Sequence, residues 1–404
     1  MVATSASMSA PHADAVAPPP SFNRCGPFYR LQHRLGLVGD TQLRCARRAL
    51  LYAALAWLPL LLLAALQGVA WNEDRASALL FDFRVHAFAI AIAAFVLMEE
   101  SADRRLRWLL QQFVARGIAP AQAQPAFVQV YQASLRRTGS PWGEALLLLL
   151  SYAMGAYWIV NSIQATAGGW AGRVVDGSMH FTWAGWWALL VTLPLYGFLC
   201  ARWLWRFGCW ALMLRGLARC PLRLVATHAD RCGGLSFVGL YPSTYTLFVF
   251  AFSTVVSAGV LRQVVYGSAG LASFKFEAIG LVLFLLVAFV LPLTAFTPRL
   301  LALKRAGLSH YGALVSRHNL AFEQRWIESA DGAAQAEALG SPDVSSLADL
   351  SAGYELVERM KPLPLAKAGV APLLLATLLP IVVVAATQAP FKQILGALKG
   401  MMLL

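Results

Sequence analysis

The sequence contains little charge for its length. Only 13% of its 404 residues are Asp, Glu, Lys or Arg, whereas 58% are hydrophobic. A soluble domain of ordinary composition has about 25% charged residues and about 45–50% apolar ones. The shortage of charge therefore argues against a soluble domain and favours a protein that folds in a lipid bilayer.

Cysteine pairs and zinc-ligand spacings are also missing. The six cysteines include no Cys-x-x-Cys pair, and the sequence predicts reduced thiols, no bound metal and no other cofactor. Residues 1–21 lack the apolar core and the basic start of a cleaved signal peptide. Because this stretch is rich in Ala, Ser and Pro, we expect a disordered N-terminal tail.

Long uncharged runs occupy much of the remaining chain. A helix needs about 20 apolar residues to cross about 30 Å of hydrocarbon, and continuous runs predict helices, whereas a β-barrel needs alternating segments. The sequence therefore predicts an all-α fold, a polytopic transmembrane helical bundle of about seven spans with helical cytoplasmic extensions. The spans are expected at about 50–71, 79–98, 145–165, 183–204, 240–262, 277–298 and 369–389.

Basic residues are distributed unequally between the connecting segments. Of the 33 Lys and Arg residues, 26 fall in alternate segments, which would all lie on one side of the membrane. By the positive-inside rule this side is cytoplasmic, so we expect a bacterial inner (plasma) membrane protein with a cytoplasmic N-terminus. The cytoplasmic parts are a basic segment at 22–48 and helical segments at 101–141, 205–236 and 299–368, and residues 391–404 are expected to be an interfacial amphipathic segment.

This topology accounts for the net charge of +13 without a nucleic-acid partner. The expected partner is the lipid bilayer. A homo-oligomer and a cytoplasmic protein partner remain open.

One candidate site is the cytoplasmic loop before the fifth span. It contains His228, Asp230, Arg231, Gly233 and Gly234. The two glycines permit unusual backbone angles that could present N–H groups to an anion, while His228 or Asp230 could transfer a proton. The alternative is a tight turn in which Asp230 caps the fifth span.

A second candidate lies in the second expected span, which contains Asp82, Arg84 and His86. Ionisable side chains within a bilayer suggest a proton or ion relay. At helical spacing Asp82 and His86 would share a face, and Arg84 would point elsewhere. Since the group lies near one end of the span, the alternative is that these side chains reach the headgroups.

Other polar and kinked positions favour structural roles. Four expected spans contain Leu-Pro, at Pro59, Pro194, Pro292 and Pro380, which could create hinges but is common in membrane helices. We expect the acidic residues that follow the second span, Glu99, Glu100 and Asp103, to pair with nearby arginines. His310, Arg317, His318 and Glu323 are interpreted as a solvated helix face.

Two strings resemble a family of uncharacterised multi-pass inner-membrane proteins of proteobacteria. The family pattern His-Pro-Asp-Arg-x-Gly-Gly-Leu is similar to residues 228–235, with Ala229 in place of Pro. Its Ser-Leu-Ala-Asp-Leu string matches residues 346–350, and its Met-Arg-Pro is similar to residues 360–362, with Lys361 in place of Arg. The resemblance implies a multi-pass membrane topology and an inner-membrane location, and it implies no activity.

The sequence leaves three function classes open. A channel or transporter of a small ion or solute would use the kinked spans as a pathway. A non-catalytic membrane scaffold or signalling component would bind cytoplasmic partners through its long basic helices. An enzyme is least favoured, because no paired carboxylates, nucleophile motif or metal-ligand set stands within the spans.

Overall fold

The computed structural model describes residues 22–39, 43–166, 169–267, 270–328 and 342–387. Helices dominate this part of the chain, and seven helical segments are long and apolar enough to cross a membrane. The protein is therefore a multi-pass membrane protein, and the predicted all-α transmembrane bundle is confirmed. The tail expected at 1–21 and the interfacial segment expected at 391–404 lie outside the described residues.

The helices begin and end as follows: α1 (Pro27–Arg34), α2 (Cys45–Leu66), α3 (Phe83–Ala115), α4 (Gln124–Thr138), α5 (Pro141–Thr166), α6 (Trp183–Trp187), α7 (Leu193–Arg219), α8 (Thr246–Tyr266), α9 (Lys275–Val290), α10 (Thr297–Phe322), α12 (Pro342–Glu358) and α13 (Lys367–Ala386). Shorter 3-10 or π segments include η1 (Leu79–Phe81), η3 (Ala188–Thr192), η4 (Ser236–Tyr245), η6 (Leu291–Phe296) and η7 (Glu323–Ile327). The two strands are β1 (Gly172–Val175) and β2 (Ser178–Phe181).

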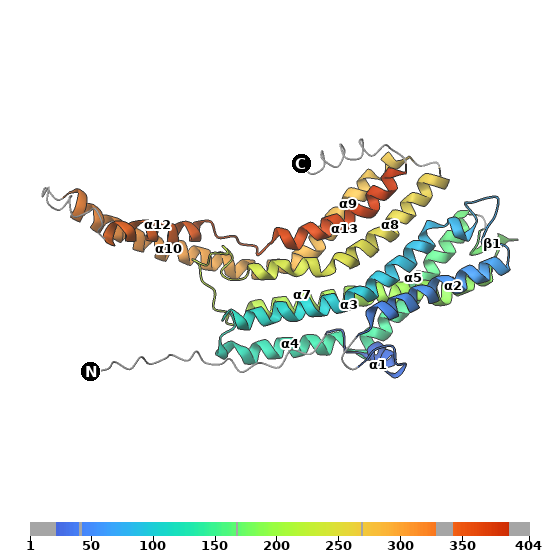
Figure 1. Ribbon diagram of the computed structural model, residues 1–404, viewed down its shortest axis with the longest axis horizontal. Helices are drawn as coiled ribbons and strands as arrows, with labels where there is room; N and C mark the ends of the chain where they lie inside the picture. The colour runs from blue at the N-terminus through green and yellow to red at the C-terminus, as the bar shows by residue number, and fades with distance from the viewer. Residues whose placement is uncertain (1–21, 40–42, 167–168, 268–269, 329–341, 388–404) are drawn as a thin grey trace, which may run out of the picture.

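The spans run side by side along the long axis of the molecule (Figure 1). Helix α3 packs against α2, α7 and α8, and α13 packs against α8. The β1–β2 hairpin lies at one end of the bundle, which we call the hairpin end. Helices α10 and α12 project from the opposite end, which we call the arm end, and together with η7 they form the arm.

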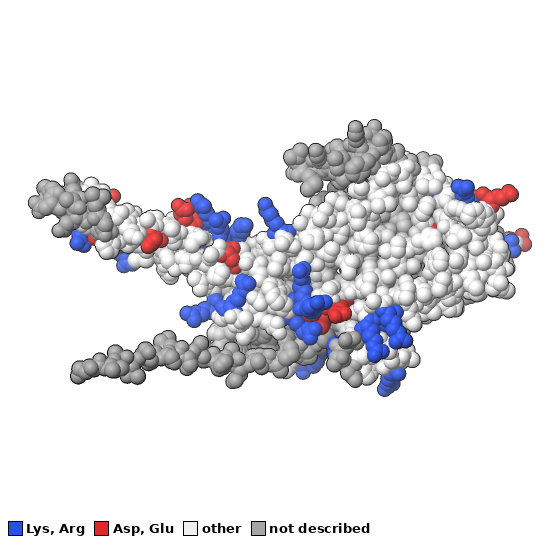
Figure 2. All heavy atoms as spheres, viewed as in Figure 1, with Lys and Arg blue, Asp and Glu red and all other residues white. Residues whose placement is uncertain are grey.

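Charged side chains are distributed unevenly along the long axis of the molecule. On the face shown in Figure 2, Lys and Arg side chains gather toward the arm end, and a broad surface without charge separates them from the few charges at the hairpin end. The uncharged surface includes exposed leucines of α2, among them Leu58, Leu62 and Leu66. Because hydrocarbon replaces water around a membrane span, this surface is where lipid contacts the protein.

The interior of the bundle is apolar along α3. Phe88 is 4% exposed, and Ile92, Phe95 and Val96 are fully buried. The ring of Phe95 packs near those of Tyr196 on α7 and Phe248 on α8, with centroids 5.9 and 5.4 Å away. In lipid such close packing contributes to helix association, since the surrounding tails are as apolar as the side chains.

Helix α13 approaches η4 very closely. A Cβ atom at Gly369 would lie 1.9 Å from the carbonyl oxygen of Gly239, and one at Gly239 would lie 2.5 Å from the carbonyl oxygen of Pro364. Only glycine permits backbones to come this near. The two glycines therefore fix the last span against the start of the fifth.

Several boundaries differ from the expected ones. The expected helical segment 205–236 is interrupted, because α7 ends at Arg219 and residues 220–235 form turns around Pro221 and two positive-φ glycines, Gly233 and Gly234. The β1–β2 hairpin was not predicted. Its turn is Asp176-Gly177, both with positive φ, and Asp-Gly is a strong hairpin signal that the sequence contained.

The four Leu-Pro positions do not behave alike. Pro59 and Pro380 lie inside α2 and α13. Pro194 follows the π segment η3, and Pro292 begins the 3-10 segment η6. Proline removes a helix hydrogen bond, and the backbone leaves the α-helical form just before Pro194, in η3, and around Pro292, in η6.

Candidate functional site

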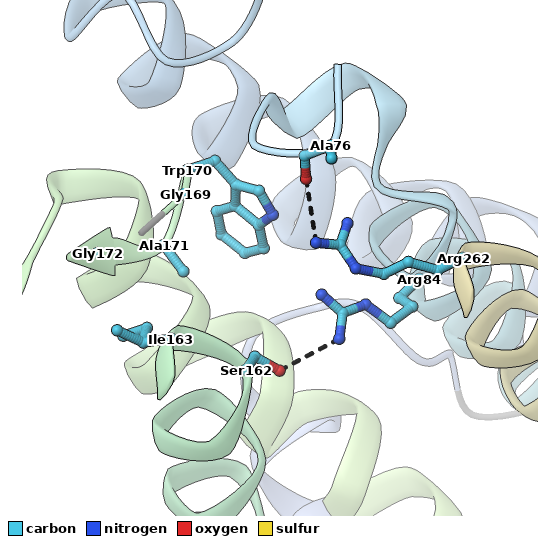
Figure 3. Close-up of a pocket in the computed structure, with 9 residues that line it drawn as sticks. All are labelled: Ala76, Arg84, Ser162, Ile163, Gly169, Trp170, Ala171, Gly172 and Arg262. Carbon is cyan, nitrogen blue, oxygen red and sulfur yellow. Dashed lines mark hydrogen bonds between the residues drawn. The ribbon is translucent and has the colours of Figure 1, made fainter. Parts of the chain in front are cut away.

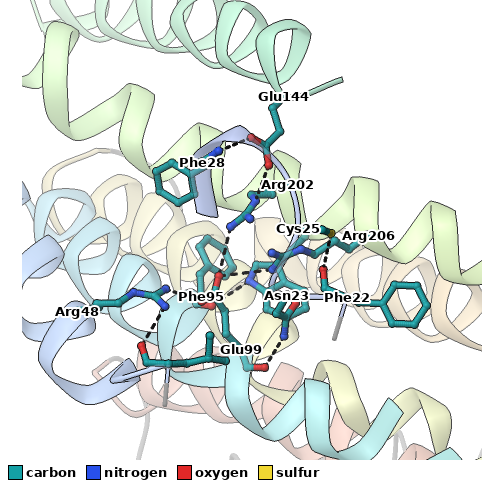
Figure 4. Close-up of polar contacts among 12 residues, drawn as sticks. Phe22, Asn23, Cys25, Phe28, Arg48, Phe95, Glu99, Glu144, Arg202 and Arg206 are labelled. Atoms are coloured by element: carbon teal, nitrogen blue, oxygen red, sulfur yellow. Dashed lines mark hydrogen bonds and ion pairs between the residues drawn. The ribbon is translucent and has the colours of Figure 1, made fainter. Parts of the chain in front are cut away.

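The most extensive polar cluster within the bundle surrounds Glu99 of α3 (Figure 4). Its carboxylate forms an ion pair with Arg48 of α2 and approaches Arg202 and Arg206 of α7, at 3.3 and 3.5 Å. All four side chains are at most 6% exposed. One carboxylate therefore lies among three buried guanidinium groups and links three spans.

A second carboxylate joins this cluster from α5. Glu144 Oε1 lies 3.4 Å from Arg202 Nε, and Glu144 Oε2 accepts a hydrogen bond of 2.7 Å from the backbone N–H of Phe28. The guanidinium of Arg202 also lies 4.9 Å from the centre of the Phe28 ring, within reach of a cation–π contact. Arg202 therefore stands between the carboxylates of α3 and α5.

The segment before α1 covers the cluster. Asn23 donates a hydrogen bond to the backbone carbonyl of Glu99. Gly26 has φ +95°, and a Cβ there would lie 2.4 Å from Glu144 Oε1. The chain can cross this close to the carboxylate because residue 26 is glycine. Together with Glu99, Glu144 and the three arginines, residues 22–28 form what we call the arm-end cluster.

A smaller ionic group lies at the hairpin end. Asp82 is fully buried. It receives hydrogen bonds of 2.9 and 2.7 Å from Arg84 and one of 2.9 Å from the Trp170 indole. Arg262 of α8 lies 3.6 Å away. We call Asp82, Arg84, Arg262 and Trp170 the hairpin-end cluster.

Asp82 and His86 do not lie on one face of a helix, contrary to the prediction from the sequence. Asp82 precedes α3 as its N-cap, with φ −84° and ψ 95°, and accepts from the backbone N–H of Arg84. Because Asp82 is not helical, the i, i+4 rule does not apply, and Arg84 is the residue that turns to meet it.

His86 has other partners. Its Nδ1 accepts from the indole of Trp57 at 3.0 Å, so Nε2 carries the proton and donates to the carbonyl of Leu80 at 3.0 Å. The structure thus brings Asp82 and Arg84 together and directs His86 toward α2.

The loop candidate is organised by Asp230. Its Oδ1 accepts from the backbone N–H groups of Cys232 and Gly234 at 2.8 and 3.0 Å, and its Oδ2 accepts from Ser236 at 3.0 Å. The N–H groups that could have bound an external anion are therefore occupied by a carboxylate of the chain itself. This geometry favours the structural alternative, in which Asp230 caps the helical turns that lead into α8.

The other residues of this loop support the same arrangement. Arg231 adopts φ +57°, and its carbonyl accepts a hydrogen bond of 2.7 Å from the N–H of Lys361, just before the last span. Burial opposes ionisation of Asp230, but its hydrogen bonds to backbone N–H groups and the nearby His228 outweigh that cost and hold its pKa below the ordinary value of 3.8.

The two clusters are separated by apolar helix. Glu99 follows Asp82 by 17 residues, which corresponds to about 25 Å at the helical rise of 1.5 Å per residue. This distance is close to the ~30 Å thickness of a hydrocarbon layer. The spacing of the clusters therefore matches that of the two interfaces of a bilayer, with the apolar residues of α3 between them.

The arm-end cluster was only partly foreseen. Pairing of Glu99 with arginines was expected as ordinary membrane-edge electrostatics, but its burial and its link to Glu144 were not. A usable signal was the position of Arg202 and Arg206 four residues apart at the end of an apolar run, where unpaired buried charge is costly. Among the described residues, no group of three or more His, Cys, Asp or Glu side chains could hold a metal ion.

Comparisons with known proteins do not extend this description. No protein family, no curated protein and no solved structure matches the chain. The fold and the two clusters define the class of protein, an α-helical multi-pass membrane protein with buried ionic clusters at the two ends of its spans.

Replacing Glu99 should destabilise the fold strongly. In Glu99→Gln the three arginines lose their shared negative charge while remaining buried, and removing one member of a buried pair costs about 3–5 kcal/mol. We expect a large drop in the unfolding midpoint in detergent. The neighbouring Glu100→Gln is the matched control, because Glu100 is 61% exposed and 4.0 Å from its partner Arg104. Equal midpoints for the two variants would contradict the assigned role.

Asp230 should make stability depend on pH in a definite direction. Its folded-state pKa lies below the ordinary value of 3.8, so the unfolded chain binds the proton more readily and stability falls as pH falls through that range. We expect Asp230→Asn to cost about 1–2 kcal/mol near neutral pH, with the difference from wild type shrinking below pH 3.8. Denaturant titrations at several pH values measure it, and Asp349→Asn, at an exposed site, is the control.

Proposed function

We propose that the chain is a non-catalytic interaction protein anchored in a bacterial inner membrane, and that its arm binds a protein partner in the cytoplasm. The observation that carries this proposal is the arm itself. Figure 1 shows α10 and α12 extending beyond the bundle. The base of α10 packs against the bundle, where Leu300 is fully buried and Arg299 donates to the backbone carbonyls of Arg219 and Cys220. Beyond this base, the helical pair presents surface for binding.

The arm is a defined antiparallel pair. Near the membrane, Lys304 Nζ donates to the carbonyl of Met360 at 3.0 Å. At the far end, the Trp326 indole donates to Asp343 at 3.2 Å, and Arg325 pairs with the same carboxylate at 3.1 Å. Contacts at both ends hold the two helices in one register, so the arm can present a fixed surface to a partner.

That surface contains exposed apolar side chains. Leu320 and Ile327 are 59% and 65% exposed. Leu320 stands on the last turn of α10 and Ile327 ends the π segment η7, so both lie toward the far end of the arm. Apolar side chains that the chain leaves uncovered at a projecting element favour a protein interface.

The cytoplasmic placement of the arm rests on charge. Lys and Arg gather toward the arm end in Figure 2, and 26 of the 33 basic residues fall in segments of that side. The positive-inside rule assigns such a side to the cytoplasm. The resemblance at residues 228–235 and 346–350 supports the same membrane.

The interior of the bundle supports a scaffold more than a pathway. The buried side chains of α3 between the two clusters are large and apolar, and Ile92, Phe95 and Val96 are fully buried. A water-filled path along α3 would have to displace them. Transport of a small anion remains the second candidate, because arginines outnumber carboxylates in both clusters and rings of Arg select anions in pores. Anion flux above the leak rate in proteoliposomes would favour it.

A photoreactive residue in place of Leu320 should crosslink to protein in intact membranes. The expected product is one adduct of defined mass, and a mass twice that of the chain would identify a second copy as the partner. Ile327→Glu, at the same end of the arm, should remove the adduct because it places charge in the contact. Asn319→Glu adds the same charge at a neighbouring exposed position and should leave the adduct intact. Crosslinks to lipid alone, or adducts equally weakened by both substitutions, would contradict the proposal.

A further inference from the structure

A small cavity lies beside the hairpin-end cluster (Figure 3). It is bordered by the guanidinium groups of Arg84 on α3 and Arg262 on α8, and by Ser162 of α5. Trp170 and the backbone of Ala76 complete the walls at the hairpin end. Three spans and two loops therefore converge on one space that is bordered by two cations.

The two arginines are not neutralised by the chain within this cluster. Asp82 supplies one negative charge for two positive ones. Arg84 donates hydrogen bonds to both carboxylate oxygens of Asp82, and the indole of Trp170 donates to one of the same oxygens. The carboxylate of Asp74 also attracts the guanidinium group of Arg262. Asp74 lies in an exposed loop, however, where water screens its charge. One positive charge is thus left in excess at a mostly buried location.

Donor groups at the cavity have hydrogen-bonding capacity left. Arg262 Nη2 donates to the carbonyl of Ala76 at 3.0 Å, whereas its buried Nη1 lies 3.6 Å from Asp82 Oδ2, beyond hydrogen-bond distance. Arg84 Nη1 donates one of its two protons to Ser162 Oγ at 3.2 Å. Figure 3 shows the two guanidinium groups lying next to each other at this space. Buried donors without acceptors are costly, and an anion would satisfy both arginines at once.

The size of the cavity limits the ligand. About 20 Å³ is open to the centre of a water-sized sphere, and about 10–15 Å³ of such space is enough for one water molecule. The cavity therefore admits a single small species. Larger anions such as phosphate and sulfate would have to widen it.

We infer that the cavity between Arg84 and Arg262 binds one monovalent anion of the size of chloride. The anion accepts hydrogen bonds from both guanidinium groups and neutralises the excess charge that Asp82 leaves. Because the two arginines stand on α3 and α8, the bound anion links these spans at the hairpin end. This site is independent of the arm and of any partner that the arm binds.

The full chain in detergent tests the inference directly. At constant ionic strength, its unfolding midpoint should rise with chloride concentration and saturate, whereas gluconate, which is too large to enter, should have no such effect. Bromide should replace chloride, and crystals soaked in bromide should show an anomalous peak between Arg84 and Arg262. A midpoint that depends on ionic strength alone, with no bromide at the site, would overturn the inference and assign the cavity to water.

Substitutions separate the site from general salt effects. Arg262→Gln removes one of the two guanidinium groups and should raise the half-saturating chloride concentration by about tenfold or more. Arg173→Gln is the matched control, since Arg173 is an exposed arginine of β1 at the same end. Asp82→Asn removes the competing carboxylate, so this variant should depend on chloride more strongly than wild type. Unchanged chloride dependence in Arg262→Gln would contradict the site, and the bromide measurement on the wild type decides the matter if a variant fails to fold.

Discussion

The structure depends on the need to neutralise arginines that are buried at the ends of membrane spans. A guanidinium group cannot lose its charge in a protein, and leaving it unpaired away from water costs several kcal/mol. Glu99 and Asp82 supply the central negative charge at the arm end and the hairpin end. Since the arginines stand on α2, α3, α7 and α8, satisfying the charges also determines which helices lie together.

This constraint explains why polar and apolar parts of the bundle alternate along its axis. The two ionic clusters are spaced along α3 as groups at two membrane interfaces would be, and α3 presents large apolar side chains between them. The resulting core is dense, and exposed apolar side chains occur on the outer surface of the spans and also on the arm, at Leu320 and Ile327. The projecting pair of helices and the apolar interior along α3 are the two features on which the proposed binding role depends.

Much of the fold could be predicted because a membrane span is determined mainly by its own residues. Continuous apolar runs of bilayer length identify helices without knowledge of their neighbours. The ion pairs could not be predicted in this way. Glu99 and Arg202 are separated by 103 positions in the sequence. Their pairing depends on how α3 and α7 are oriented, which the sequence alone does not give. The predicted shared face of Asp82 and His86 was wrong for a local reason. Asp82 is the N-cap of α3 and therefore does not follow the helical repeat. For Asp230 the capping alternative was foreseen, because Asp before a helical turn is a common signal.

We expect the two clusters to lie at the two membrane interfaces. Spin labels at the lipid-facing positions Leu51, Leu58 and Leu66 of α2 test it in liposomes, because oxygen concentrates in the middle of the bilayer and a water-soluble nickel complex is excluded from it. Leu51 lies near Arg48 of the arm-end cluster, and Leu66 ends the helix toward the hairpin end. We expect the greatest depth at Leu58 and shallower values at both other positions. Greatest depth at Leu51 or Leu66, or equal access of the nickel complex to all three, would contradict this placement.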